Sequence, residues 1–215
     1  MRRRSLFLVL FLGLALGCGR GGSRAPSGGS PPGASAPVAA PAAVAAPPST
    51  PLPGRSVYQL GSTFTDQHGR PFELGSTRGH PTVVLLFYGT CEAACPILIE
   101  DVMHVDEALP EGVRANVRYT LVSFDPENDT PERLLALARE KHMDEARFRL
   151  VTGRPSDILS LAVVLGVQYT KRGEGDFSHS NVITLLDRDG VIATKLDGLH
   201  QPNEAFVARA AELAR

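Results

Sequence analysis

The chain has 215 residues, with 22 basic and 23 acidic side chains and a formal net charge of −1 at pH 7. This balance provides no basic surface of the kind that binds nucleic acid, and it argues against a nucleic-acid partner. Only three cysteines occur, and two of them lie four residues apart.

Residues 1–18 have the pattern of an export signal. Three arginines precede an apolar run from Leu6 to Leu16, which is shorter than the roughly 20 residues that a transmembrane helix needs. The segment Ala15-Leu16-Gly17-Cys18 resembles the lipobox of bacterial lipoproteins, in which the cysteine is acylated and becomes the mature N-terminus. We therefore expect acylation of Cys18, with ordinary signal cleavage as the alternative. The protein is then extracytoplasmic, on the periplasmic side, and anchored to the membrane by lipid.

Residues 19–55 consist almost entirely of Gly, Ala, Pro and Ser. Such a segment cannot bury enough apolar surface to offset the entropy cost of ordering it. We expect a disordered tether that lets a folded domain move away from its anchor.

Residues 56–215 are the length of one domain and show alternating strand and helix patterns. Two short strands are expected around the turn signal at 68–71, followed by a central strand at 82–89 that is buried on both faces. Later patterns predict, in chain order, a helix after Pro96, a strand ending at Asp125, a helix capped by Thr130, a strand at 147–153, a helix at 155–167, a hairpin around Asp189-Gly190 and a terminal helix.

This order of elements predicts an α/β fold of the thioredoxin-like class. The expected architecture is a mixed sheet flanked by helices on both faces, with an added N-terminal hairpin.

Cys91 and Cys95 follow the predicted central strand, at the sheet edge where α/β proteins place reactive groups. Cysteine also packs as a small apolar residue, but the polar and glycine neighbours indicate a partly open loop. A disulfide between residues four apart on a helix needs a distorted first turn, and Pro96 is expected to allow it by biasing Cys95 away from the α region. In the reduced state the two thiolates can converge on a metal ion.

Two thiolates call for a third ligand, and the chain offers six histidines. Most are explained by turns, helix ends or distance along the predicted helix. His179 is the candidate, because we expect it at the start of a strand beside the central one, facing the cysteine loop. An ordinary surface or core histidine remains the alternative. The other five are His68, His80, His104, His142 and His200.

From about Ser62 to the C-terminus the chain resembles the Sco/SenC family of copper-binding proteins that assemble cytochrome oxidase. The resemblance rests on "FTDQHGRPFEL", on the apolar strand leading into Cys-x-x-x-Cys-Pro, on "VSFDPENDTPERL" and on "FSHSNVITLLDRDG". The chain departs from the commoner family pattern at Tyr88-Gly89-Thr90-Cys91, where family members often have Gly-Tyr-Thr, one further residue and then Cys.

The resemblance implies one copper ion per chain, held by Cys91, Cys95 and His179. Two soft thiolates and one imidazole suit Cu(I), and Cu(II) stands at the top of the divalent affinity order, although zinc remains an alternative. Asp125, at the expected strand end, is a candidate outer-shell group that tunes a ligand.

We expect a metallochaperone for the copper site of a respiratory (cytochrome c) oxidase. Its partners would be a copper-containing oxidase subunit and, as further candidates, another copper chaperone or a thiol reductase. A thiol-disulfide oxidoreductase that reduces a partner's metal-binding cysteines is the alternative. A thiol peroxidase ranks low, because no arginine lies near Cys91 in sequence to activate the thiolate.

Overall fold

The computed structural model describes residues 50–173 and 176–215. The expectations for the export signal, for Cys18 and for the tether up to residue 49 lie outside these residues. None of the helices in the described ranges is long and apolar enough to cross a membrane.

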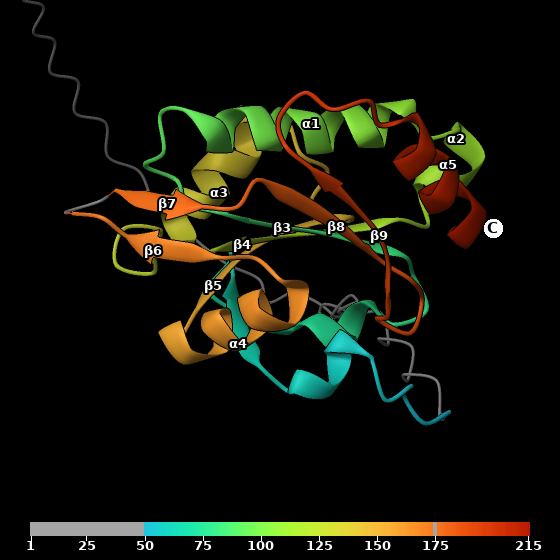
Figure 1. The fold of residues 1–215 in the computed structure, drawn as a ribbon, viewed down its shortest axis with the longest axis horizontal. Coiled ribbons are helices and arrows are strands. Elements are labelled where there is room, and N and C mark those ends of the chain that lie inside the picture. Colours follow the sequence, from blue (N-terminus) through green and yellow to red (C-terminus); the bar gives the residue numbers. More distant parts are fainter. Residues whose placement is uncertain (1–49, 174–175) are drawn as a thin grey trace, which may run out of the picture. The chain divides into compact units, whose positions relative to one another are not determined.

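A seven-stranded mixed sheet forms the centre of the fold, with the strand order β2-β1-β5-β4-β3-β8-β9 (Figure 1). Strands β3, β4 and β5 are parallel, and the other pairs are antiparallel. All six residues of β3 are buried, which confirms the predicted central strand. The bounds are β1 (Thr63–Asp66), β2 (Pro71–Glu73), β3 (Thr82–Phe87), β4 (Arg118–Ser123), β5 (Phe148–Gly153), β8 (Val182–Leu186) and β9 (Ile192–Asp197).

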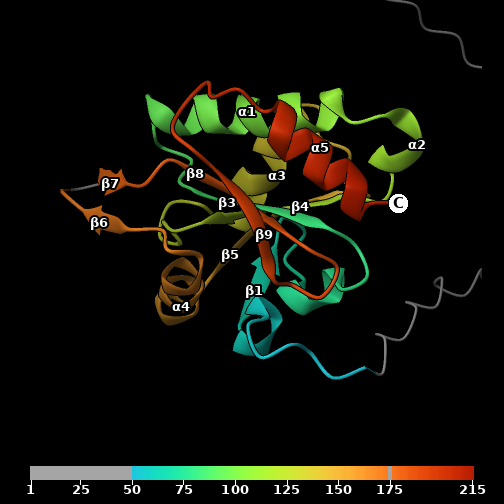
Figure 2. The same cartoon turned by 45° about the vertical axis from the view of Figure 1, so that its right-hand side comes forward.

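Helices cover both faces of the sheet, as predicted. Figures 1 and 2 show α1, α3 and α5 on one face and α4 on the other. The Thr130 side chain accepts a hydrogen bond from the Arg133 N–H and caps α3. The bounds are α1 (Ala94–Ala108), α2 (Glu111–Arg114), α3 (Pro131–Glu140), α4 (Pro155–Leu165) and α5 (Glu204–Leu213), with short 3-10 helices η1 (Val57–Leu60) and η2 (Leu74–Thr77).

Helix α1 is held against the sheet by an apolar stripe. Leu98, Val102 and Val105 are fully buried, and their spacing places them on one side of the helix. The stripe fixes the N-terminal end of α1 beside the carboxyl end of β3, where the cysteines lie.

The expectation that Pro96 keeps Cys95 out of the helix is wrong. Helix α1 begins at Ala94, so both Cys95 and Pro96 lie in its first turn. Proline is tolerated there because the first backbone N–H groups of a helix have no intrahelical partner. The irregular residue is instead the N-cap Ala93, with φ −116° and ψ −83° and no capping hydrogen bond from its side chain.

His179 does not begin the strand beside β3, so that expectation is also wrong. It ends β7 (Phe177–His179), which pairs with β6 (Tyr169–Lys171) in a separate two-stranded ribbon. The neighbour of β3 is β8, which begins three residues later at Val182. Figure 1 shows the ribbon projecting from the body of the fold on the side where α1 begins.

Candidate metal centre

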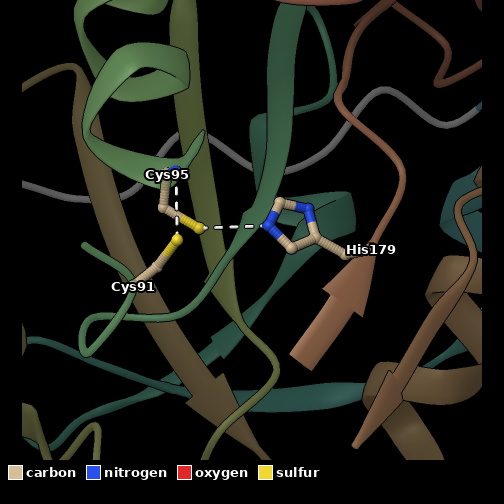
Figure 3. A group of neighbouring side chains, drawn as sticks. All are labelled: Cys91, Cys95 and His179. Carbon is tan, nitrogen blue, oxygen red and sulfur yellow. Dashed lines mark hydrogen bonds between the residues drawn. The ribbon is translucent and has the colours of Figure 1, made fainter. Parts of the chain in front are cut away.

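Both cysteines have free thiols, and their surroundings differ. Cys91 lies in the loop between β3 and α1 and is partly buried, whereas Cys95 is only 1% exposed. The Cys95 backbone N–H donates to the Cys91 Sγ at 3.3 Å, and the Tyr88 N–H donates to the Cys95 Sγ at 3.5 Å. The start of α1 therefore points a backbone donor at the Cys91 sulfur (Figure 3), and the end of β3 points one at the Cys95 sulfur.

The ribbon places His179 against the thiols. Its Nε2 lies 3.5 Å from the Cys95 Sγ, and the ligand atoms of Cys91, Cys95 and His179 all lie within 4.8 Å of one another (Figure 3). The Nδ1 atom lies 3.1 Å from the Ser180 carbonyl oxygen. Because a carbonyl can only accept a hydrogen bond, Nδ1 is the donor of this pair, and in the neutral ring it is Nε2 that presents its lone pair to the thiols.

Aromatic rings hold the ribbon in this position. Phe124, just after β4, stacks on Tyr169 of β6 with ring centroids 4.8 Å apart, and it packs against Phe177 of β7 at 5.2 Å. Tyr88 meets the His179 ring edge-on at 5.8 Å. This aromatic cluster thus fixes the imidazole although β7 does not pair with the central sheet. Our interpretation of the sequence missed the cluster.

The pKa values of the two thiols are shifted in opposite directions from the ordinary thiol value. Burial acts to raise the pKa of Cys91, but hydrogen bonds from the backbone N–H groups of Cys95 and Ala93 outweigh it, so the pKa lies below the ordinary thiol value. At Cys95 the deeper burial dominates and raises the pKa far above that value. Burial also raises the pKa of Tyr88 to about 12. The partly exposed sulfur is therefore the one that more readily forms a thiolate.

The candidate outer-shell residue Asp125 is buried, but its hydrogen bonds stay within its own loop. Its Oδ2 accepts from the Asn128 side chain at 2.8 Å, and its N–H donates to the Ser123 Oγ. In the described residues Asp125 has no hydrogen bond to Cys91, Cys95 or His179. A second carboxylate four residues on, Asp129, accepts instead from the Gly89 N–H in the cysteine loop.

The remaining histidines lie elsewhere in the fold. His68 contacts Glu145, His80 contacts the Asn116 carbonyl and His200 contacts Asp101. Within residues 50–173 and 176–215, no other group of three or more cysteine, histidine or acidic side chains could hold a metal ion.

Comparison with protein families finds one match that spans most of the chain. The sequence model of the SCO1/SenC family matches residues 55–215. A Stutzerimonas stutzeri protein described as "Putative copper-binding protein" is 27% identical over 157 residues, which cover 68% of this chain and 74% of that protein.

Solved structures show the same fold. A SCO1/SenC family lipoprotein from Bacillus anthracis has a TM-score of 0.65 and 24% identity, covering 71% of this chain and 92% of that chain. The copper-bound structure of Bradyrhizobium japonicum ScoI has a TM-score of 0.54 and 25% identity, covering 71% of this chain and 94% of that chain. The predicted thioredoxin-like α/β fold is therefore confirmed.

Proposed function

Because this chain belongs to the SCO1/SenC family, we propose that it is an extracytoplasmic copper metallochaperone that serves the copper site of a respiratory oxidase. One observation carries the proposal. Two sulfur atoms and one imidazole nitrogen, from segments 84 residues apart, lie within 4.8 Å of one another.

The donor set fits copper. Thiolate sulfur is a soft ligand that favours Cu(I), and imidazole suits copper in either oxidation state. Cys91, Cys95 and His179 would hold one ion per chain. The Stutzerimonas protein is described as copper-binding and the structure of Bradyrhizobium ScoI contains copper, and both relatives support the choice of copper.

The exposure of the three proposed ligands suits transfer of a copper ion to a partner protein. Cys91 and His179 are partly exposed, whereas Cys95 is buried. A partner can therefore approach Cys91 and His179 while Cys95 stays covered, and the hydrogen bond from Nδ1 to the Ser180 carbonyl leaves the Nε2 lone pair of the neutral His179 ring available to a metal ion. A copper-containing oxidase subunit is the proposed recipient, with another copper chaperone or a thiol reductase as further partners.

The proposed location follows from the N-terminal sequence. Acylation of Cys18 would anchor the protein to the membrane, and the Bacillus anthracis relative is described as a lipoprotein. Mass spectrometry of the protein from its native envelope would test the acyl group. An unmodified Cys18, or a mature chain that lacks it, would contradict the anchor.

Anaerobic Cu(I) titration of the reduced full chain tests the metal site. We expect about one ion per chain, and Cys91→Ser, Cys95→Ser and His179→Ala should each weaken binding by about tenfold or more. His104→Ala is the control, because this histidine lies on the exposed side of α1. Unchanged copper binding in the double cysteine variant would refute the proposal.

The unequal thiols favour a second candidate, thiol-disulfide exchange. The Cys91 thiolate would attack a partner's disulfide and form a mixed disulfide. Cys95 would then lose its proton and attack the Cys91 sulfur, forming the Cys91–Cys95 disulfide and releasing the partner with two reduced thiols. Reduction of a disulfide-containing oxidase fragment would detect this activity, and His179→Ala should leave it intact while weakening copper binding. No reduction by the reduced chain would rule it out.

A further inference from the structure

We infer that Asp129 is a positioning residue for the cysteine loop, the segment Tyr88–Ala93 between β3 and α1. Its carboxylate fixes the backbone of this loop and thereby the place of the Cys91 thiol. The positioning stands on geometry alone. Its effect on copper rests on the proposed function.

One oxygen of Asp129 joins two strand ends. Its Oδ2 accepts the Gly89 N–H at 2.8 Å and the Ser123 hydroxyl at 2.5 Å. Gly89 follows β3, and Ser123 is the last residue of β4. The Asp129 side chain is 1% exposed, and a carboxylate buried so deeply must be hydrogen-bonded to be tolerated. The cysteine loop supplies one of the two hydrogen bonds that Oδ2 accepts.

The contact leaves no room for a side chain on the loop. A Cβ atom at Gly89 would collide with the Asp129 carboxylate. The backbone of the cysteine loop is therefore packed directly against the carboxylate. Gly89 directly follows Tyr88, whose N–H donates to the Cys95 Sγ, and it lies two residues before Cys91. A shift of the backbone at Gly89 would therefore disturb the surroundings of both sulfur atoms.

The other backbone hydrogen bonds described for the cysteine loop are long or go to sulfur. The Cys91 N–H reaches the Tyr88 carbonyl at a long 3.4 Å, and Ala93 provides no side-chain cap for α1. A short hydrogen bond to a charged acceptor is stronger than these neutral contacts. The bond from Gly89 to Asp129 is therefore a strong polar restraint on the loop.

Asp125 provides a matched control, because it tests whether any disturbance of the loop between β4 and α3 has the same effect as loss of the Asp129 contact with Gly89. It lies in the same loop between β4 and α3, is 2% exposed, and is hydrogen-bonded through its side chain to Asn128. Substitution of either aspartate should disturb that loop. Only substitution of Asp129 should release Gly89.

The first measurement needs no copper. Amide hydrogen exchange of Gly89, followed by NMR in the reduced, metal-free full chain, should be at least about tenfold faster in Asp129→Ala than in the wild type. Asp125→Ala should leave it within about threefold. Asp129→Asn should largely restore protection, because its amide oxygen can accept the same hydrogen bonds. Wild-type exchange at Gly89 in Asp129→Ala would overturn the inference.

The second measurement is Cu(I) affinity. Asp129→Ala should bind at least about tenfold more weakly than the wild type, and Asp125→Ala within about threefold of it. If Asp129→Ala does not fold, Gly89→Ala carries the same expectation, because its methyl group displaces the carboxylate. Wild-type affinity in these variants would overturn the link to the metal site. A wild type that binds no copper would refute the proposed function instead, and Gly89 exchange would still test the positioning.

Discussion

The two thiols of the site are chemically identical residues that the fold treats differently. Cys91 receives backbone hydrogen bonds and keeps some solvent contact, whereas Cys95 is enclosed by the core. Each thiolate is disfavoured by burial and favoured by hydrogen-bond donors, and the balance differs between the two positions.

This difference predicts unequal alkylation by iodoacetamide. In Cys95→Ser, which keeps the backbone N–H that bonds the Cys91 Sγ, Cys91 should react with a pH midpoint below that of an ordinary thiol. In Cys91→Ser, Cys95 should react far more slowly and gain reactivity only at higher pH, because its folded-state pKa is raised. Rates measured by mass spectrometry between about pH 6 and 10 cover the ordinary thiol value. Equal profiles would contradict the assignment.

Sequence interpretation identified the residues with a chemical signature and missed those that support them. The cysteine pair and His179 could be selected from residue type and family resemblance, and the structure brings them together. Asp129 could not be distinguished from Asp125, because its contact with Gly89 joins residues 40 apart in sequence. A hydrogen bond of that kind depends on how two strand ends meet, and neither segment carries a local signal for it.

At the scale of elements, the β6–β7 ribbon decides where the imidazole lies. Its two strands have three residues each and contain mostly exposed or partly exposed side chains. Such short strands lack the apolar run that made β3, β4 and β5 predictable. The ribbon is stabilised by packing of its rings on Phe124 instead.

Replacement of Phe124 by leucine should therefore loosen His179. The side chain remains apolar, but the stacking with Tyr169 is lost, so we expect Cu(I) affinity to fall by about threefold or more along with about 1 kcal/mol of stability. Phe148→Leu is the control, since Phe148 is 1% exposed and stacks on Tyr119 in a different cluster. Titration and thermal unfolding of both variants would separate the effects. Equal copper affinity in the two variants would contradict a role for the ribbon packing.

At the scale of the whole described fold, the residues just before and at the start of η1 are hydrogen-bonded to the turn between β8 and β9. The Val57 N–H donates to the Gly190 carbonyl at 2.9 Å, and the Ser56 hydroxyl donates to the Asp189 carbonyl at 2.5 Å. The sequence predicted the hairpin at Asp189-Gly190, and the structure confirms it. It did not predict that η1 would lie on that turn, because no local pattern encodes contacts between residues 133 apart.

Gly190→Ala should destabilise the protein by about 1–3 kcal/mol. Gly190 has φ +80°, which strains any other residue, and a Cβ there would lie 2.6 Å from the Tyr58 ring. Thermal unfolding measures the loss. Gly112→Ala is the control, because a Cβ there meets nothing within 4 Å. Equal melting temperatures for the two variants would contradict the docking of Tyr58 on this turn.

The separation of the imidazole from the sulfur atoms along the chain has a mechanical consequence. A copper ion bound as proposed, by Cys95 and His179 together, would join two residues that lie 84 positions apart and so close a long loop of the chain. Such a cross-link restricts the unfolded chain, and any ligand that prefers the folded state raises its stability. The loaded protein should therefore melt at a higher temperature than the empty one. This difference in melting temperature should shrink in His179→Ala, because the ion then no longer joins the two segments. The melting temperature would therefore report whether copper is bound.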